Sequence, residues 1–249
     1  MGHCMFLRKG ETHTAPLSGI LASDIAVGST VKLMENGVAV DYLVVNQGIP
    51  SGSSLYDASC DGMWLLRKDC LDNQRYQASG TANNSYASSL IPSYLNYTFF
   101  STLDSVAQSV INYVRIPICA GGGSTTVSNS IQRVFLLSYA ELGFNYNSNY
   151  LAYTDGALLS YFLSGESSTQ NSKRTSVYSN GGGAATYWTR SPLSNDFGAV
   201  LCVGTTGERS EAGTQDEDRY GGTNAIRPAL ILPSTALFDK NTLILKGVA

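Results

Sequence analysis

The residues that most often carry nucleophilic or metal chemistry are few in this chain. Both histidines, His3 and His13, lie within the first sixteen residues. A body without histidine excludes Ser-His-Asp and Cys-His catalysis and most zinc-hydrolase sites. Carboxylate, lysine, tyrosine or cysteine chemistry stays open, but the pattern favours a binding protein over an enzyme.

The cysteines do not form a metal-binding pattern. They stand at positions 4, 60, 70, 119 and 202, without a C-x-x-C pair. Their number and spacing fit neither a zinc site nor a disulfide-dense scaffold. A single Cys60–Cys70 bridge stays open, although free thiols fit synthesis in a reducing cytoplasm better. Cys202 alternates with apolar neighbours and has no base beside it, which favours buried packing. We therefore expect no cofactor and no metal.

The most polar stretch is GERSEAGTQDEDR, residues 207–219, which contains five acids and no large apolar side chain. It lies a few residues before the apolar run AIRPALILP. Ca²⁺ binds carboxylate oxygens, but EF-hand spacing is absent, so a solvated acidic face is favoured for residues 216–218. Asp57 and Asp61 likewise fit a turn better than a metal site.

Composition limits the class of protein. Of 249 residues, 43% are hydrophobic and 14% charged, and the net charge is −3, so a sizeable core is expected. There is no basic stripe for nucleic acid, and no apolar run reaches the ~18 residues of a membrane span. The start lacks the apolar core of a signal peptide. We expect residues 1–17 to be an arm, linker or tag, and residues 18–249 to be one domain made in the cytoplasm.

Spacing predicts the elements that would position these residues. Asn36-Gly37 predicts a two-residue hairpin within residues 27–48. Helices are expected in residues 88–114, with Ser101 and Asp104 capping the second. The other predictions are strands at 62–70, 115–119, 186–192, 198–207 and 224–234, a strand running into a short helix at 134–143, a helix at 156–165 and a flexible loop at 120–130. Together they predict a loop-rich α+β domain with strands at both ends.

Several local patterns, taken in order, resemble a known family. They are VGSTVKL, LYDASCDGMWLLRKD, IPSYLN, VFLLSYAELG, YWTRSP and IRPALILP. Over residues 20–238 the chain resembles DUF6273-type domains of bacteria and their phages. It also resembles the C-type-lectin-fold variable proteins that retroelements diversify, such as phage tail receptor-binding proteins. The most specific pair is W-x-R-S-P followed by R-P-A-L. The resemblance implies a C-type-lectin-like fold with a variable region at about residues 187–228.

In that family, scaffold positions hold the fold while exposed positions vary. Carried onto this chain, the scaffold includes Trp188, Arg190 and Arg227, for which structural roles are favoured over sugar stacking or anion binding. The expected ligand-facing residues are Thr189, Ser194, Asn195, Asp196, Phe197, Leu201, Glu208, Arg209, Glu211, Gln215, Asp216, Glu217, Asp218, Arg219, Tyr220, Thr223 and Asn224. Loops on a rigid sheet accept substitution readily. The many acids indicate a partner with positive or hydrogen-bond-donor groups.

The resemblance thus implies a non-enzymatic receptor-recognition protein on a virion, as a phage tail component, or on a bacterial cell surface. Its partner would be a cell-surface protein or glycan, without nucleic acid or membrane insertion. Homo-oligomers would add avidity, and residues 1–17 could attach the domain to a larger particle. Two alternatives stay open. One is a formylglycine-generating type of enzyme, with Cys202 as nucleophile or copper ligand. The other is a structural tail component without a ligand.

Overall fold

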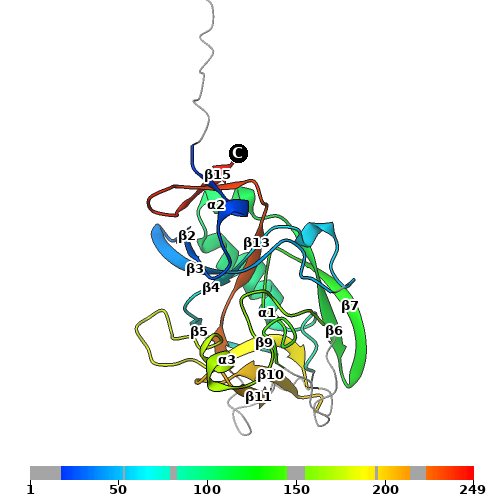
Figure 1. The fold of residues 1–249 in the computed structure, drawn as a ribbon. Coiled ribbons are helices and arrows are strands. Elements are labelled where there is room, and N and C mark those ends of the chain that lie inside the picture. Colours follow the sequence, from blue (N-terminus) through cyan, green and yellow to red (C-terminus); the bar gives the residue numbers. More distant parts are fainter. Residues whose placement is uncertain (1–17, 53, 79–82, 145–154, 194–195, 214–222) are drawn as a thin grey trace, which may run out of the picture.

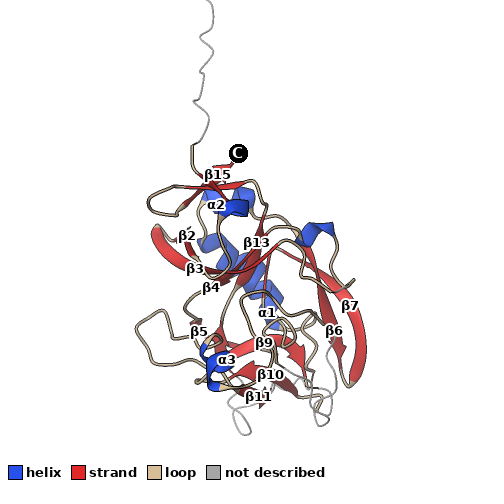
Figure 2. Cartoon of the chain, in the orientation of Figure 1, coloured by secondary structure: helices blue, strands red, loops and turns tan. Residues whose placement is uncertain are grey.

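A computed structural model of the chain describes residues 18–52, 54–78, 83–144, 155–193, 196–213 and 223–249 (Figure 1). The predicted N-terminal arm, residues 1–17, lies outside the described residues. Antiparallel strands dominate the fold, and the helices are few and short (Figure 2). The predicted mixture of strands, helices and long loops is present, with more strand than the sequence indicated.

Two five-stranded sheets form the body of the protein, one above the other in Figure 1. The upper sheet has the order β2-β3-β4-β13-β8, and the lower one the order β11-β10-β9-β12-β5. The upper strands are β2 (Thr30–Glu35), β3 (Val38–Gln47), β4 (Met63–Arg67), β13 (Ala229–Leu232) and β8 (Val134–Phe135). The lower strands are β11 (Arg209–Gly213), β10 (Ala199–Val203), β9 (Tyr187–Pro192), β12 (Thr223–Ile226) and β5 (Leu71–Arg75).

Smaller elements surround the two sheets. A three-stranded sheet joins β1 (Ile20–Leu21), β14 (Ala236–Phe238) and β15 (Leu245–Val248), so the two ends of the described chain lie together. A separate hairpin consists of β6 (Val114–Gly121) and β7 (Ser124–Gln132). The α-helices are α1 (Leu90–Ser93), α2 (Ser105–Val110) and α3 (Ser168–Ser172). A π-helix spans Tyr94–Phe99, and 3-10 turns span Ala22–Asp24, Ala58–Cys60 and Phe100–Thr102. No helix in the described ranges is long and apolar enough to cross a membrane.

The β2–β3 hairpin confirms the prediction made from Asn36-Gly37. Asn36 and Gly37 have φ angles of 48° and 79°, the left-handed conformation that a two-residue hairpin turn requires. The next strand, β4, is buried at every position. Its Trp64 lies in the core and donates from Nε1 to the carbonyls of Gly48 and Cys60, at 3.1 Å each.

The predicted last strand is divided by Pro228. β12 pairs with β5 and β9 in the lower sheet, whereas β13 pairs with β4 and β8 in the upper sheet. Proline has no N–H for a ladder, and the Pro228 carbonyl instead accepts from Arg67 N at 2.8 Å. The chain therefore passes from one sheet to the other at Arg227-Pro228 and couples them.

Three local predictions are wrong. Residues 124–132 form β7 rather than a flexible loop, since they pair with β6 across a turn at Gly122-Gly123. Residues 156–165 form no helix: Ser160 N donates to Asn46 Oδ1, and Tyr161 N to the Val45 carbonyl. Residues 139–143 form a turn rather than a short helix.

The cap of α2 also differs from the prediction. Asp104 is the N-cap, and its Oδ1 accepts from Ala107 N at 2.8 Å. Ser101 instead donates to the Thr98 carbonyl. The predicted helical region thus exists, but it is interrupted at Leu103, where the backbone is extended.

Candidate binding surface built on strand β9

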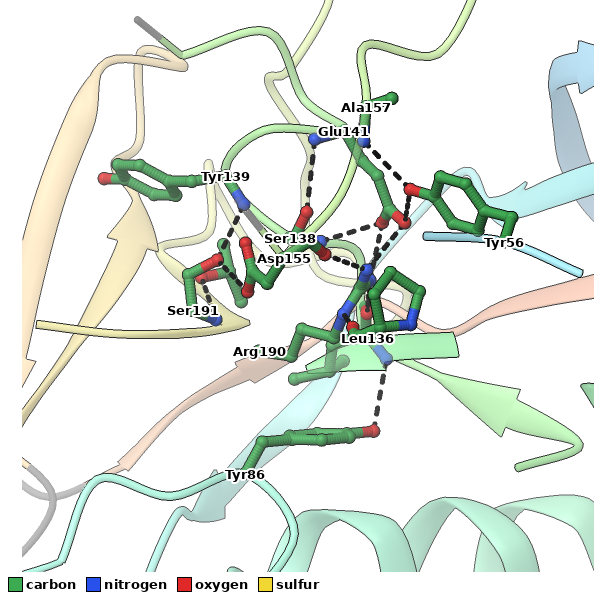
Figure 3. Close-up of polar contacts among 12 residues, drawn as sticks. Tyr56, Tyr86, Leu136, Ser138, Tyr139, Glu141, Asp155, Ala157, Arg190 and Ser191 are labelled. Carbon is green, nitrogen blue, oxygen red and sulfur yellow. Dashed lines mark hydrogen bonds and ion pairs between the residues drawn. The ribbon is translucent and has the colours of Figure 1, made fainter. Parts of the chain in front are cut away.

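Strand β9, which carries the sequence YWTRSP, is buried at all its positions. Its Arg190 donates from Nη1 and Nη2 to the two carboxylate oxygens of Glu141, at 2.5 and 2.6 Å (Figure 3). The other donors reach the carbonyls of Pro117, Leu136 and Asp155, each at 2.8 Å. All five guanidinium donors are therefore used, and one side chain joins β9 to four distant positions.

Glu141 anchors further groups to the same ion pair. Its Oε1 accepts from Tyr56 Oη at 2.8 Å, and its Oε2 accepts from Ser138 N at 2.9 Å. Burial alone would lower the pKa of Arg190, but the Glu141 carboxylate outweighs burial and raises it. The guanidinium is thus charged at any physiological pH, and its position depends on Glu141.

Asp155 is the second buried acid beside Arg190. Its Oδ2 accepts from Ser191 Oγ at 2.9 Å, and Ser191 Oγ accepts from Tyr139 N at 2.9 Å. Its Oδ1 has no hydrogen-bond partner in the described part of the chain. Burial raises the pKa of Asp155 to about 6, although Arg190 and Ser191 lower it in part. This carboxylate is consequently the group of the network whose charge changes near neutral pH.

The other predicted scaffold residues are also buried. Trp188 Nε1 donates to the Gln74 carbonyl at 2.9 Å, and its ring lies 5.1 Å from that of Tyr76. Arg227 donates to the carbonyls of Arg67, Lys68 and Arg174 and to Tyr187 Oη. These contacts give both side chains structural roles.

The structure divides the predicted ligand-facing residues into three groups. Thr189 and Leu201 are buried, and Thr189 Oγ1 donates to the Leu201 carbonyl at 2.6 Å; the prediction that they face a ligand is wrong, because β9 and β10 are covered on both faces. Asp196 and Phe197 are exposed, whereas Glu208, Arg209, Glu211, Thr223 and Asn224 are half-buried. Ser194, Asn195, Gln215, Asp216, Glu217, Asp218, Arg219 and Tyr220 lie outside the described residues.

These positions do not form one continuous face. The β10–β11 ladder runs from the Ala199–Gly213 pair to the Val203–Arg209 pair. At ~3.3 Å per residue, its two ends lie about 13 Å apart. Asp196 and Phe197 adjoin the first end, while Glu208 belongs to the turn at the second.

Asn84 fixes the end of the ladder that carries Phe197. It is fully buried, and its Nδ2 donates to the carbonyls of Leu193, Asp196 and Ala199 at 2.6 to 2.9 Å. Its Oδ1 accepts from Gly122 N at 2.8 Å. One amide thus ties the β9–β10 connection to the tip of the β6–β7 hairpin. No sequence signal distinguished Asn84 from its neighbour Asn83.

Phe197 projects from this connection over the hairpin tip. Its side chain is 58% exposed. A Cβ atom on Gly123 would lie 2.4 Å from the Phe197 ring, so the ring rests directly on that glycine. Phe197 therefore presents an exposed aromatic ring from a connection whose backbone is held by the buried amide of Asn84.

The turn at the other end of the ladder is held by its own hydrogen bonds and by contacts with Glu166 and Asn171. Burial raises the pKa of Glu208, but hydrogen bonds from Thr206 outweigh it and lower this pKa overall. Arg209 pairs with Glu166 at 2.6 Å. Gly207 has a φ of 83°, and a Cβ there would lie 1.9 Å from the Asn171 carbonyl oxygen. Glu208 and Arg209 therefore stabilise the turn and are less free to contact a ligand.

The cysteines of the described chain are buried and free. This holds for Cys60 and Cys70, so the bridge left open by the sequence is absent. Burial raises the pKa of Cys60 to about 11 and that of Cys119 to about 12, and it raises that of Cys202 well above the usual value. Thiols of this kind are poor nucleophiles at neutral pH. No cluster of metal-binding side chains occurs among the residues described.

Comparison with known proteins identifies one family. Residues 61–234 match the model of a family described as a domain of unknown function (DUF6273). The match covers well over half of the chain and includes every element from β4 to β13. No curated protein and no solved structure matches the chain.

Replacing Asn84 by aspartate should destabilise the protein by about 1–3 kcal/mol, because a carboxylate would face three carbonyl oxygens in a buried site. Hydrogen exchange should accelerate at the amides of Gly122 and Ala199. The neighbouring Asn83→Asp variant is the control, since its side chain can still accept from Ser85 N. Equal stability and exchange in the two variants would refute the role given to Asn84.

Asp155 should make the protein less stable as pH rises. Its folded pKa of about 6 lies above the value of 3.8 for a free carboxyl, so the folded state binds the proton more tightly. The stabilisation is full below about pH 4 and is lost as pH rises through about 6, by about 3 kcal/mol in total. Denaturant unfolding of the wild type and of Asp155→Asn measures this difference. A gap between the two that is constant from pH 4 to pH 7 would contradict the assignment.

Proposed function

We propose that this chain, which belongs to the family of the domain of unknown function DUF6273, is a non-enzymatic ligand-binding protein. Exposed connections around the β9–β10–β11 sheet would recognise a receptor. The sheet would act as a fixed support, and the connections as the exchangeable part. Recognition would rest on surface complementarity and would form or break no covalent bond.

The contrast between strand and connection carries this proposal. β9 and β10 are buried at every position, whereas Asp196 and Phe197, between them, are exposed. The connection is held through its backbone carbonyls by Asn84. Since these carbonyls are present whatever the side chains are, residue 197 can change without loss of the support. A change at residue 196 also removes the hydrogen bond from Gly198 N to Asp196 Oδ1, but that bond is exposed and the carbonyl contacts remain.

The cysteine environment favours binding over the enzymatic alternative. A formylglycine-generating type of mechanism would need a reactive thiol at Cys202. That thiol is fully buried, and its raised pKa opposes thiolate formation. Its Sγ lies 3.6 Å from Asn224 Nδ2 and 3.5 Å from the Val200 carbonyl, contacts that suit a packed side chain.

The exposed groups indicate the class of partner. Asp196 and Phe197 are exposed and offer a carboxylate and an aromatic ring, and the half-buried Glu211, Thr223 and Asn224 add carboxylate, hydroxyl and amide groups. Aromatic area combined with short polar side chains is typical of adaptable binding surfaces. We infer a cell-surface protein or glycan that has hydrogen-bond donors.

The biological setting follows from the resemblance to retroelement-diversified proteins with a C-type-lectin fold. We propose a phage tail or a bacterial surface as the location. Residues 1–17 would provide the attachment, and several linked copies would convert weak contacts into avidity.

Sequencing the DNA that flanks the gene tests this proposal. We expect a reverse transcriptase gene and a near-copy of the codons for residues 187–228. The two copies should differ almost only at template adenines. The differing codons should include those for Asp196 and Phe197 and spare those for Arg190 and Ser191.

Two outcomes would count against the proposal. Without a copy and a reverse transcriptase, a fixed-specificity adhesin or a structural particle component would take precedence. Differences concentrated at the codons of buried β9 residues would contradict the division into support and exchangeable connection.

A further inference from the structure

A groove beside α3 concentrates positive charge on a chain whose net charge is −3. It has a volume of about 470 Å³, within the range of small-molecule sites. Of the described residues that line it, Lys68, Lys173 and Arg227 are cations and Asp69 is the one acid. An excess of one charge in a concave site raises the local concentration of ligands of the opposite charge.

Lys173 is positioned for a ligand. Its Nζ donates to the Tyr161 carbonyl at 2.8 Å and lies 4.5 Å from the centre of the Tyr161 ring. A lysine ammonium has three donors. One is used by the carbonyl, and two remain to bind an oxyanion. Both contacts are with neutral groups, so the charge of Lys173 is not cancelled by them.

Arg227 forms a rigid part of the groove wall. Its hydrogen bonds to the carbonyls of Arg67, Lys68 and Arg174 and to Tyr187 Oη use four of the five guanidinium donors. Burial holds it in one place. It therefore contributes positive potential from a fixed position and supports the backbone of Lys68.

Lys68 lies at the exposed side of the groove. Its side chain is 57% exposed, and its Nζ is 3.5 Å from Asp41 Oδ2. That carboxylate is shared with Lys32, which is its closer partner. Lys68 is therefore weakly held and can move toward a bound anion.

Neutral groups complete the groove. Hydroxyls line it at Thr30, Ser172, Thr175, Ser176 and Thr205. The walls are already fixed, because Ser176 Oγ donates to the Lys68 carbonyl at 2.9 Å and Cys70 N donates to the Val177 carbonyl at 2.8 Å. A preformed site of this kind loses little free energy to ordering when a ligand binds.

We propose that this groove binds a small hydroxylated oxyanion, namely a sugar that carries a carboxylate or a phosphate group. Lys173 and Lys68 contact the oxyanion, and the serine and threonine hydroxyls contact the sugar hydroxyls. The groove is separate from the exposed connection that carries Phe197, and the proposal does not rest on the function proposed above.

Isothermal titration calorimetry at low ionic strength, with glucuronate, ribose phosphate and neutral glucose as probes, tests this site on the full chain. We expect at least one anion to bind and glucose not to bind. Lys173→Gln should weaken binding about tenfold, the effect of losing one charged hydrogen bond. Lys68→Gln should weaken it less, and Lys240→Gln, an exposed lysine outside the groove, should not change it.

Each outcome decides the proposal. Preference for glucuronate identifies a carboxylate ligand, and preference for ribose phosphate identifies a phosphate ligand; both support the site. Equal binding of the anions and glucose overturns it, as does unchanged anion binding by Lys173→Gln. If Lys173→Gln does not fold, the exposed Lys68→Gln variant decides, and unchanged binding there overturns the proposal.

Discussion

The buried pair of Arg190 and Glu141 is the constraint on which the lower sheet depends. Removing two ions from water is costly, and the cost is offset only when nearly every donor and acceptor is satisfied. Here the guanidinium uses all its donors, and the carboxylate also accepts from Tyr56 and Ser138. Loss of one partner from such a pair typically costs 3–5 kcal/mol. β9 is therefore held in one position relative to the segments that contribute Pro117, Leu136, Glu141 and Asp155.

Because β9 is fixed, the two ends of the neighbouring β10–β11 ladder can be held in different ways. At one end of the β10–β11 ladder, Asn84 holds the backbone and leaves Phe197 exposed. At the other end, Gly207 packs on Asn171 and Arg209 pairs with Glu166. The first end therefore leaves its side chains exposed, and the second is held by packing and an ion pair. The groove beside α3 is lined by the cations Lys68, Lys173 and Arg227, whereas the exposed connection between β9 and β10 carries the acid Asp196.

The sequence predicted those elements whose conformation is set by their own residues. Asn36-Gly37 specified its hairpin through backbone conformation alone, and the apolar runs of β4 and β9 indicated buried strands. Residues 156–165 were mispredicted because their backbone groups bond to the distant strand β3. Residues 124–132 were mispredicted because a polar run after three glycines gives no sign of its pairing with the preceding strand β6. Arg190 was expected to be structural, but its partner Glu141 could not be identified, since the two are 49 positions apart. Asn84 escaped notice because a polar loop gives no sign of which amide is buried.

In the proposed function, β9 and the residues that hold it form a fixed support, and the exposed connection between β9 and β10 is exchangeable. A folding selection on a library with randomised codons for single positions measures this most directly. We expect most substitutions to survive at positions 196 and 197, and few to survive at Thr189, Arg190, Ser191 and Glu141. Broad tolerance at Arg190 and Glu141, or intolerance at Asp196 and Phe197 equal to that of β9, would contradict it.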